Sequence, residues 1–234
     1  MDRILAFDLW GEYAHFRKYY TTTSPLTYSF PPRTALCGLM GAILGLSKET
    51  YLSHFLKDRA TLGVALLSPV KKVHFSENLI DTDPGRPMNL IKNHTRIRIE
   101  FLKDPRYRVY FSHADPELYE RARDLIDRHQ CVYTPCLGLS EHIANFSFVG
   151  EYRAARVDDP GKIEIRTVVP DNHIREIAFA SGAEYMTETM PNEMLPDRTV
   201  TEYRAMLFER RGRPIRASLS ECWRLDDGSA ISIL

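Results

Sequence analysis

The sequence predicts an α+β fold in which a ferredoxin-like domain, residues 1–152, precedes a small β-rich domain, residues 153–234. Over the first part, apolar stretches with strand and helix periodicity follow one another in the order β-α-β-β-α-β. After Arg153 the pattern changes to short β-like runs separated by glycine, proline and Asn/Asp clusters, and the turn at 158–161 marks the boundary. In this second part, strands are expected at 163–169, 173–180, 200–208 and 230–234.

The elements of the first domain follow from apolar periodicity. Residues 3–10 are apolar on both faces apart from Asp8, which is typical of a buried strand. Pro32 suits the first position of a helix, and apolar residues then recur at helical spacing as far as Leu44. Asp115 and Pro116 are the residue types of a cap and first helical position, so a second helix is expected there. The remaining predictions are a short helix at 49–57 and strands at 60–68, 95–103, 107–111 and 142–152.

The first predicted helix carries a stripe without side chains, formed by Gly38, Gly41 and Gly45. Each glycine costs a helix roughly 1 kcal/mol relative to alanine, so the stripe predicts that another backbone packs closely against it. At the start of this helix the amides of Arg33 and Thr34 have no partner within the helix. Together with the Arg33 side chain they predict an anion site.

Residues 95–103 alternate between Ile97, Ile99 and Phe101 on one face and Arg96, Arg98 and Glu100 on the other. With residues 107–111 this segment predicts a hairpin with one basic face, which either contacts RNA or is simply solvated. The preceding stretch, 76–94, has weak periodicity and an Asp-Pro-Gly turn. A connection of this length in a compact domain is usually functional or mobile.

Cations and aromatic rings are interleaved in the segment that leads into the first helix. Arg17 and Lys18 are followed by Tyr20, Tyr28 and Phe30. This mixture suits a phosphate backbone with stackable bases, and the alternative is an ordinary buried helix behind a polar loop.

The composition limits the classes of function. The formal net charge is zero, but 23 of the 31 basic residues are arginines, which favours RNA or tightly paired interfaces. A neutral total still permits a local basic groove. No apolar run approaches the roughly 20 residues of a membrane span, so no membrane partner is expected. Four irregularly spaced cysteines and the lack of an evident secretion signal predict a cytoplasmic protein.

Two segments together resemble a known family. Phe16-Arg17-Lys18, the run from Thr27 to Thr34 and the glycine helix form the first segment, and residues 134–146 (TPCLGLSEHIANF) form the second. They are similar to the signature of the CRISPR-associated subunit that caps the 5′ handle of the guide RNA in type I Cascade complexes, the fifth Cas family of the RAMP superfamily. The length of the first match favours type I-B.

The resemblance implies a non-catalytic protein without cofactor or metal, which binds the 5′ handle of the crRNA. It also implies docking to the large, PAM-reading subunit and to the backbone subunit. Target DNA would be contacted only through the assembled complex. A thumb hairpin would be inserted at about 76–94. The expected RNA-binding residues are Arg17, Lys18, Tyr20, Tyr28, Phe30, Arg33, Thr34, Lys72, Lys92, His94, Arg96, Gly138, Leu139 and Ser140.

Two other classes of function stay open. Relatives in type I-C systems cleave precursor RNA without metal. Such a cut needs a base, an acid and a cation. The candidates in this sequence are His74, one of Lys71 and Lys72, and one of Tyr28 and Tyr51. The sequence lacks the adjacent Lys-His pair of the cleaving members. A protein-only interaction module is the third class.

Two further readings of the second segment are disfavoured. Residues 138–142 do not form a serine nucleophile elbow, because His142 stands where the elbow needs glycine. His129, Cys131, Cys136 and His142 match no common zinc spacing, so these cysteines are expected to be structural.

Overall fold

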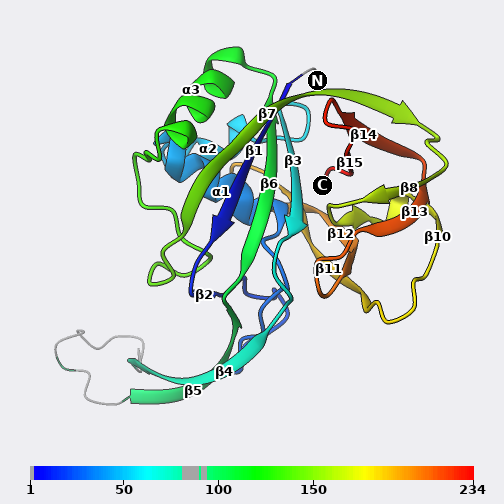
Figure 1. Cartoon of the computed structure of the whole chain (residues 1–234). Coiled ribbons are helices and arrows are strands. Elements are labelled where there is room, and N and C mark those ends of the chain that lie inside the picture. The colour runs from blue at the N-terminus through cyan, green and yellow to red at the C-terminus, as the bar shows by residue number, and fades with distance from the viewer. Residues whose placement is uncertain (1–2, 81–89, 91–93) are drawn as a thin grey trace.

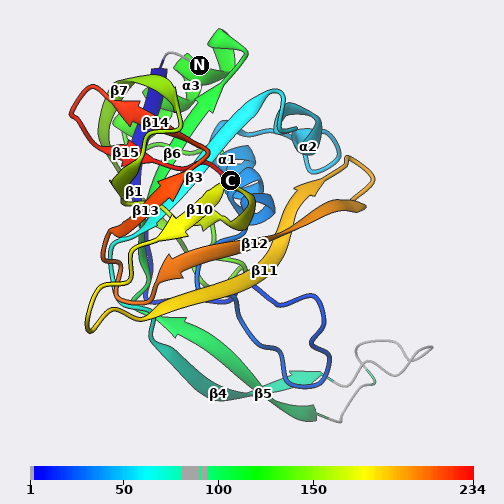
Figure 2. The same cartoon turned by 90° about the vertical axis from the view of Figure 1, so that its right-hand side faces the viewer.

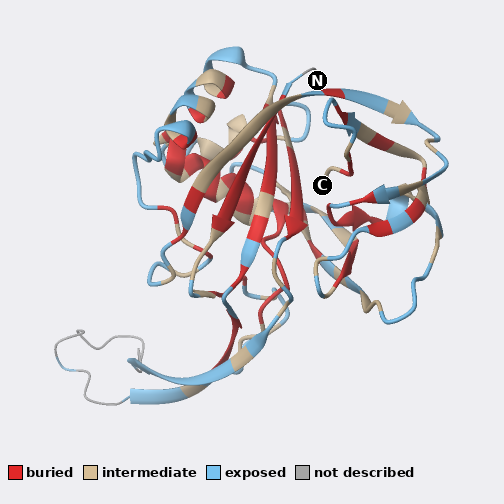
Figure 3. Cartoon of the chain, viewed as in Figure 1, coloured by how far each residue is buried: buried red, intermediate tan, exposed pale blue. Residues whose placement is uncertain are grey.

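The computed structural model describes residues 3–80, 90 and 94–234 and shows an α+β chain built on a curled β-sheet (Figure 1). Its centre consists of β1 (Arg3–Trp10), β3 (Ala60–Leu66), β6 (Arg106–His113) and β7 (Asn145–Asp158). These strands lie in the order β7-β1-β6-β3, and every neighbouring pair is antiparallel. Figure 3 shows that β1, β6 and β3 are mostly buried, as the predicted apolar runs require.

The described helices α1 (Arg33–Leu44), α2 (Tyr51–His54) and α3 (Pro116–Asp127) lie on one side of these strands (Figures 1 and 2). Both long helices begin where the sequence predicts. The Asp115 carboxylate accepts a hydrogen bond from the Glu117 amide at 2.9 Å, which confirms the predicted cap. Among the described helices, each is too short or too polar to cross a membrane.

A long hairpin of β4 (Lys72–Ile80) and β5 (His94–Lys103) projects from the body of the protein (Figure 1). The prediction that 95–103 pairs with 107–111 is wrong, because β5 pairs with β4 and with β2 (Tyr13–Ala14), whereas β6 belongs to the central sheet. Asp104 has a φ of 50°, and at this turn the chain passes from one sheet to the other. The tip of the predicted thumb, including Lys92, lies outside the described residues.

The later strands extend the central sheet instead of forming a separate one. The second half of β7 pairs with β14 (Glu221–Leu225). Beyond β14 the sheet continues in the order β15 (Ala230–Ile231), β8 (Lys162–Ile165), β13 (Ile215–Leu219) and β10 (Ile174–Ile177). Within the part of the chain that the structure describes, these strands and the central four make one nine-stranded sheet. This sheet therefore contains strands from both sides of residue 152. The division of the chain into two domains at that residue stays a prediction.

A second, long hairpin closes the other side of the molecule (Figure 2). It consists of β11 (Tyr185–Met194) and β12 (Val200–Glu209), and β12 also pairs with β9 (Val169–Pro170). The sequence predicted β12 but not β11, β13 or β14. In β11 charged and polar residues interrupt the apolar pattern, whereas β13 and β14 are only five residues long each.

At Gly38 and Gly41 the nearest neighbours are side-chain atoms, so the prediction of a closely packed backbone is wrong there. At the end of the helix a second backbone does approach, since the Val132 amide donates to the Ile43 carbonyl at 3.1 Å. Gly41 faces the Tyr51 side chain, since a Cβ added at Gly41 would lie 3.2 Å from the Tyr51 Cβ atom. At Gly38 an added Cβ would meet the nearest described atom, Tyr51 Oη, at 3.9 Å. Gly45 has a φ of 72° and ends the helix in the left-handed conformation. Gly38 and Gly41 thus leave room beside Tyr51, and both line the candidate site, whereas Gly45 packs against Val132.

Candidate functional site

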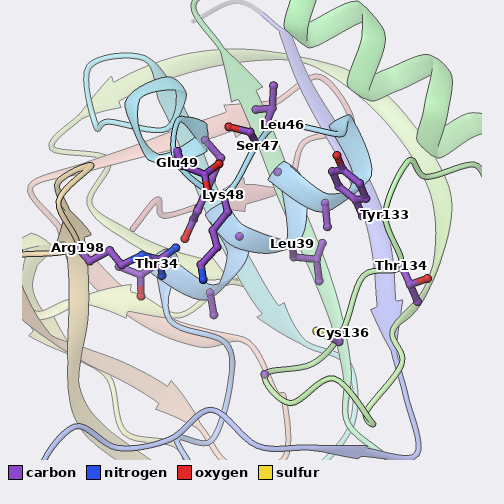
Figure 4. A pocket seen from close by; sticks show the side chains of 16 residues that line it. Thr34, Leu39, Leu46, Ser47, Lys48, Glu49, Tyr133, Thr134, Cys136 and Arg198 are labelled. Carbon is purple, nitrogen blue, oxygen red and sulfur yellow. The ribbon is translucent and has the colours of Figure 1, made fainter.

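A groove runs past the N-terminal end of α1 and consists of two connected hollows. The first, of about 630 Å³, lies over the glycine face of α1 and is shown in Figure 4. We call it the helix hollow. The second, of about 500 Å³, lies beside β4 and β5, and we call it the hairpin hollow. The residues common to both are Thr34, Ala35, Tyr51, Gly138 and Arg198, so they form one continuous groove.

The start of α1 makes one end of the helix hollow electropositive. Pro32 occupies the N-cap position, where its side chain has no hydrogen-bond acceptor to offer, and the first turn contains no acidic residue. The Ala35 and Leu36 amides donate to the Pro32 carbonyl at 2.9 and 3.0 Å. The helix dipole adds partial positive charge at this end.

Two cations that the sequence analysis did not single out reach the same place. Figure 4 shows the side chains of Lys48 and Arg198 directed toward Thr34, from the segment after α1 and from the turn between β11 and β12. Arg198 holds this position with a φ of 68°. Because Lys48 and Arg198 come from segments without periodicity, only the folded chain brings them together with the helix end.

Gly138 allows the loop between α3 and β7 to pack against the first segment of the chain. Its φ is 96°, and an added Cβ would lie 1.9 Å from the His15 carbonyl oxygen. The His15 amide donates to the Leu137 carbonyl at 3.0 Å. The sequence predicted a close approach of this loop to phosphate, and the close approach in this structure is to the His15 backbone. Leu139 lines the hairpin hollow, while Ser140 is exposed and bonds to Glu141 at 3.2 Å.

The two faces of the β4–β5 hairpin differ in chemistry. Glu77, Leu79, Ile99 and Phe101 line the hairpin hollow. Because side chains alternate along a strand, their neighbours point away from it. That opposite face carries the cross-strand pairs His74 with Glu100, Ser76 with Arg98, Asn78 with Arg96, and Ile80 with His94. The predicted basic face of β5 is therefore present, but it faces away from the groove.

Two of the predicted phosphate ligands are already paired with buried carboxylates. The Lys18 ammonium lies 3.1 Å from a Glu188 oxygen, and that of Lys72 lies 3.2 Å from Glu100 and 3.7 Å from Glu188. Burial works to lower the pKa of Lys18, but the nearby Glu188 carboxylate outweighs it and the pKa is raised. Both lysines therefore already have carboxylate partners within the protein, and Lys72 is in addition exposed to solvent.

Three other predicted contacts lie in the core. Phe30 packs edge-on against Phe208, with ring centroids 5.2 Å apart. Arg33 is 2% exposed and donates to the carbonyls of Phe55 and Ala60 at 2.9 and 2.8 Å. Tyr28 is 1% exposed, and its hydroxyl has no hydrogen-bond partner among the described residues.

The remaining predicted residues stay accessible. Arg17 lines the hairpin hollow and donates to the Thr21 carbonyl at 2.8 Å. Thr34 lines both hollows, whereas Tyr20 is exposed and lines neither, three residues after Arg17. His94 and Arg96 are exposed on the outward face of the hairpin, where Arg96 donates to Asn78 at 3.4 Å.

The residues proposed for RNA cleavage are not brought together. His74 lies on the outward face of the hairpin, 3.7 Å from Glu100, whereas Tyr28 and Tyr51 line the groove on the other side. Lys71 is exposed at the base of the hairpin. For metal chemistry, no group of three or more His, Cys, Asp or Glu side chains within residues 3–80 and 94–234 is arranged to hold an ion. The four cysteines are free thiols.

Two histidines beside the groove favour the neutral form. Burial lowers the pKa of His15, whose Nδ1 atom lies 2.7 Å from the Glu100 carbonyl oxygen and donates to it. Burial likewise lowers the pKa of His142, whose ring packs against Phe101 with centroids 5.1 Å apart. Protonation of either ring would place a charge where the fold does not solvate it.

Gly138→Ala is expected to destabilise the fold by roughly 3 kcal/mol or more, because strain at positive φ adds to a steric overlap with the His15 carbonyl. Gly182→Ala is the matched control, since Gly182 has a φ of 70° but an added Cβ would meet no described atom within 4 Å. It should cost only about 1 kcal/mol. Urea unfolding followed by circular dichroism measures both free energies, and equal losses would contradict the packing role of Gly138.

Stability should fall on acidification below about pH 6.5, the ordinary pKa of an unfolded histidine. The pKa values of His15 and His142 are lowered in the folded chain, so the unfolded chain binds more protons as the pH falls through this range. We expect the urea midpoint to decrease from about pH 7.5 to about pH 5.5, and less steeply in a His15→Asn variant, whose amide can still donate to Glu100. An unchanged slope in that variant would exclude His15 as a cause.

One known protein family matches most of the sequence. The family described as CRISPR-associated protein (Cas_Cas5) matches residues 4–216. No curated protein matches the chain. Among solved structures, a CRISPR protein from Archaeoglobus fulgidus is similar, with a TM-score of 0.59, 14% identity and 97% of both chains covered.

Two chains from larger assemblies are also similar. One belongs to a CRISPR RNA-guided surveillance complex, with a TM-score of 0.51, 14% identity, and 98% of this chain and 93% of that chain covered. The other belongs to a type III-B Cmr-beta complex bound to cognate target RNA and AMPPnP, with a TM-score of 0.50, 12% identity, and 92% and 86% covered. At these identities the structural likeness concerns the fold. The family match spans most of the sequence, and this chain therefore belongs to the Cas5 family of CRISPR-associated proteins.

Proposed function

We propose that this chain is the non-catalytic subunit that binds and caps the 5′ handle of the crRNA in a type I surveillance complex. Membership of the Cas5 family and the similarity to chains of crRNA-guided complexes support a role in a CRISPR effector complex. The observation that carries the finer proposal is the continuous groove at the positive end of α1, with Lys48 and Arg198 beside it.

The groove has the parts that single-stranded RNA requires. Its electropositive end, the α1 terminus, attracts phosphate. The hollow beside the hairpin is also lined by Leu79, which is 45% exposed and provides apolar surface for a base. Arg17 and Arg198 both line this hollow and supply the fork-shaped donors that bind phosphate in bidentate fashion. We therefore assign phosphate contacts to Arg17, Arg198, Lys48 and the Thr34 amide.

The other predicted ligands take different roles in this proposal. Gly138, Leu139 and Ser140 form the loop that borders the groove, and Tyr20 lies outside the two hollows, three residues after Arg17. His94 and Arg96 carry the basic outer face of the hairpin, which would meet the guide segment of the RNA. Lys18, Lys72, Arg33, Tyr28 and Phe30 support the groove from beneath, through ion pairs, carbonyl bonds and core packing.

The proposal has finer parts that rest on the sequence resemblance. The order of β7, β1, β6 and β3 with two crossing helices supports the ferredoxin-like description. The hairpin would serve as the thumb, the subtype would be I-B, and the complex would be cytoplasmic. The large and backbone subunits would dock on faces outside the groove, and target DNA would be met only within the assembled complex.

Arg198→Ala and Lys48→Ala are each expected to weaken RNA binding several-fold with little change in melting temperature, because both side chains lie at the surface of the groove. Affinity should fall with salt, with a log-log slope of about −0.7 for each phosphate contact on a single strand. Each variant should make that slope shallower by about one contact. Fluorescence anisotropy with labelled repeat RNA at several salt concentrations measures both effects.

Two controls separate groove contacts from other effects. Arg121→Ala removes an exposed arginine from α3, outside the groove, and should leave affinity and slope unchanged. Arg33→Ala should instead lower stability by about 1–3 kcal/mol, since it leaves two buried carbonyls without donors. Normal RNA binding by both Arg198→Ala and Lys48→Ala would remove the groove from the proposal.

Incubation of the purified protein with labelled repeat RNA, with and without EDTA, tests the enzymatic alternative. We expect a shifted but intact RNA in both conditions, because His74 does not share a surface with Tyr28 and Tyr51. Cleavage that persists in EDTA and disappears in His74→Ala would establish a metal-independent endoribonuclease. Failure to bind any RNA would favour a protein-only interaction module.

A further inference from the structure

Three tyrosine rings form an exposed cluster outside the two hollows, close along the backbone to residues that line the hairpin hollow. Tyr19 and Tyr20 are each 59% exposed, and Tyr203 is 43% exposed. The Tyr19 ring centroid lies 5.1 Å from that of Tyr20, edge to face, and 4.7 Å from that of Tyr203. Tyr203 comes from β12 and lies far from the other two in sequence, so the cluster exists only in the folded chain. Exposed aromatic clusters on soluble proteins commonly mark binding surfaces.

The loop that carries two of these rings is held in place by its own hydrogen bonds. The Lys18 amide donates to the Leu26 carbonyl at 2.8 Å, and the Thr21 amide donates back to the Lys18 carbonyl at 3.2 Å. The Arg17 guanidinium closes the loop by donating to the Thr21 carbonyl at 2.8 Å. Rings on a fixed loop lose little conformational freedom on binding, which favours their use as a platform.

Both sides of the cluster adjoin residues that line the hairpin hollow. Arg17 lines that hollow and precedes Tyr19 by two positions. Pro191 also lines it and is the direct cross-strand neighbour of Tyr203 in the β11–β12 ladder. A chain that follows the groove toward this end therefore meets the tyrosine cluster as it leaves.

We propose that Tyr19, Tyr20 and Tyr203 form a composite platform on which one unpaired nucleobase of the bound RNA stacks. This inference rests on the proposed RNA-binding function and adds a contact from the C-terminal part of the chain. Stacking on aromatic rings tolerates any base, because every base has a π-face. It would hold one end of the strand without reading its sequence.

The surroundings of the cluster favour a nucleobase over a protein side chain. The loop between the tyrosines and Pro25 consists of three threonines and Ser24, whose hydroxyls suit ribose and phosphate oxygens. Arg17 lies at the same edge and provides a cation.

Short single-stranded RNAs of randomised sequence, each with 2-aminopurine at one defined position, test this platform. The fluorescence of 2-aminopurine is quenched when the base stacks, so a scan of positions finds the stacked nucleotide. We expect strong quenching at one or two adjacent positions with the full-length protein. Tyr203→Ala should abolish this quenching and weaken binding about tenfold, whereas Tyr203→Phe, which keeps the ring, should preserve both.

Phe179→Ala is the matched control, because Phe179 is a 73% exposed ring in the C-terminal part of the chain that lines neither hollow. It should bind RNA and quench as the unmodified chain does. RNA binding without quenching at any position, or unchanged quenching in a folded Tyr203→Ala, would overturn the platform while leaving the groove intact. Loss of partner assembly alone in Tyr203→Ala would reassign the cluster to a protein contact. If the unmodified chain binds no RNA, both the platform and the proposed function fail.

Discussion

The carboxylate of Glu188, whose side chain is 9% exposed, joins three parts of the chain that are far apart in sequence. From β11 it accepts hydrogen bonds from the Ser29 amide and hydroxyl, at 2.8 and 3.1 Å, and from the Lys18 ammonium at 3.1 Å. Lys72, at the base of the β4–β5 hairpin, lies between Glu188 and Glu100. A carboxylate this enclosed is tolerable only with all of these donors, so the three segments must fold together.

This constraint explains why two predicted RNA ligands act inside the protein. Lys18 and Lys72 neutralise Glu188 and Glu100, and those carboxylates in turn orient the segments that form the groove walls. Glu100 also accepts from the Thr27 amide at 3.1 Å, which fixes the segment leading to α1. Arg17 and Arg198 line the hairpin hollow and have no such carboxylate partner among the described residues, so the proposal assigns RNA contacts to them.

Local signals in the sequence were sufficient for the central strands, for α1 and α3, and for the family. Pro32 and Asp115 marked helix starts correctly because helix termini depend on neighbouring residues only. Strand partners depend on contacts across long sequence distances, so the pairing of β5 with β4 was missed. The burial of Arg33 could not be predicted either, since its acceptors are carbonyls of a distant segment at Phe55 and Ala60.

The groove is bordered by residues from opposite ends of the polypeptide. Arg17 contributes one wall, and Met194 and Arg198, at the end of β11 and in the turn after it, contribute another. During synthesis Arg17 leaves the ribosome long before Arg198. Until Arg198 has been made, the N-terminal end of α1 lacks one of its neighbouring cations. A chain that is still being synthesised, or that is truncated before Met194, therefore lacks one wall of the groove. The groove can hold a ligand only after this later segment has been made and has folded.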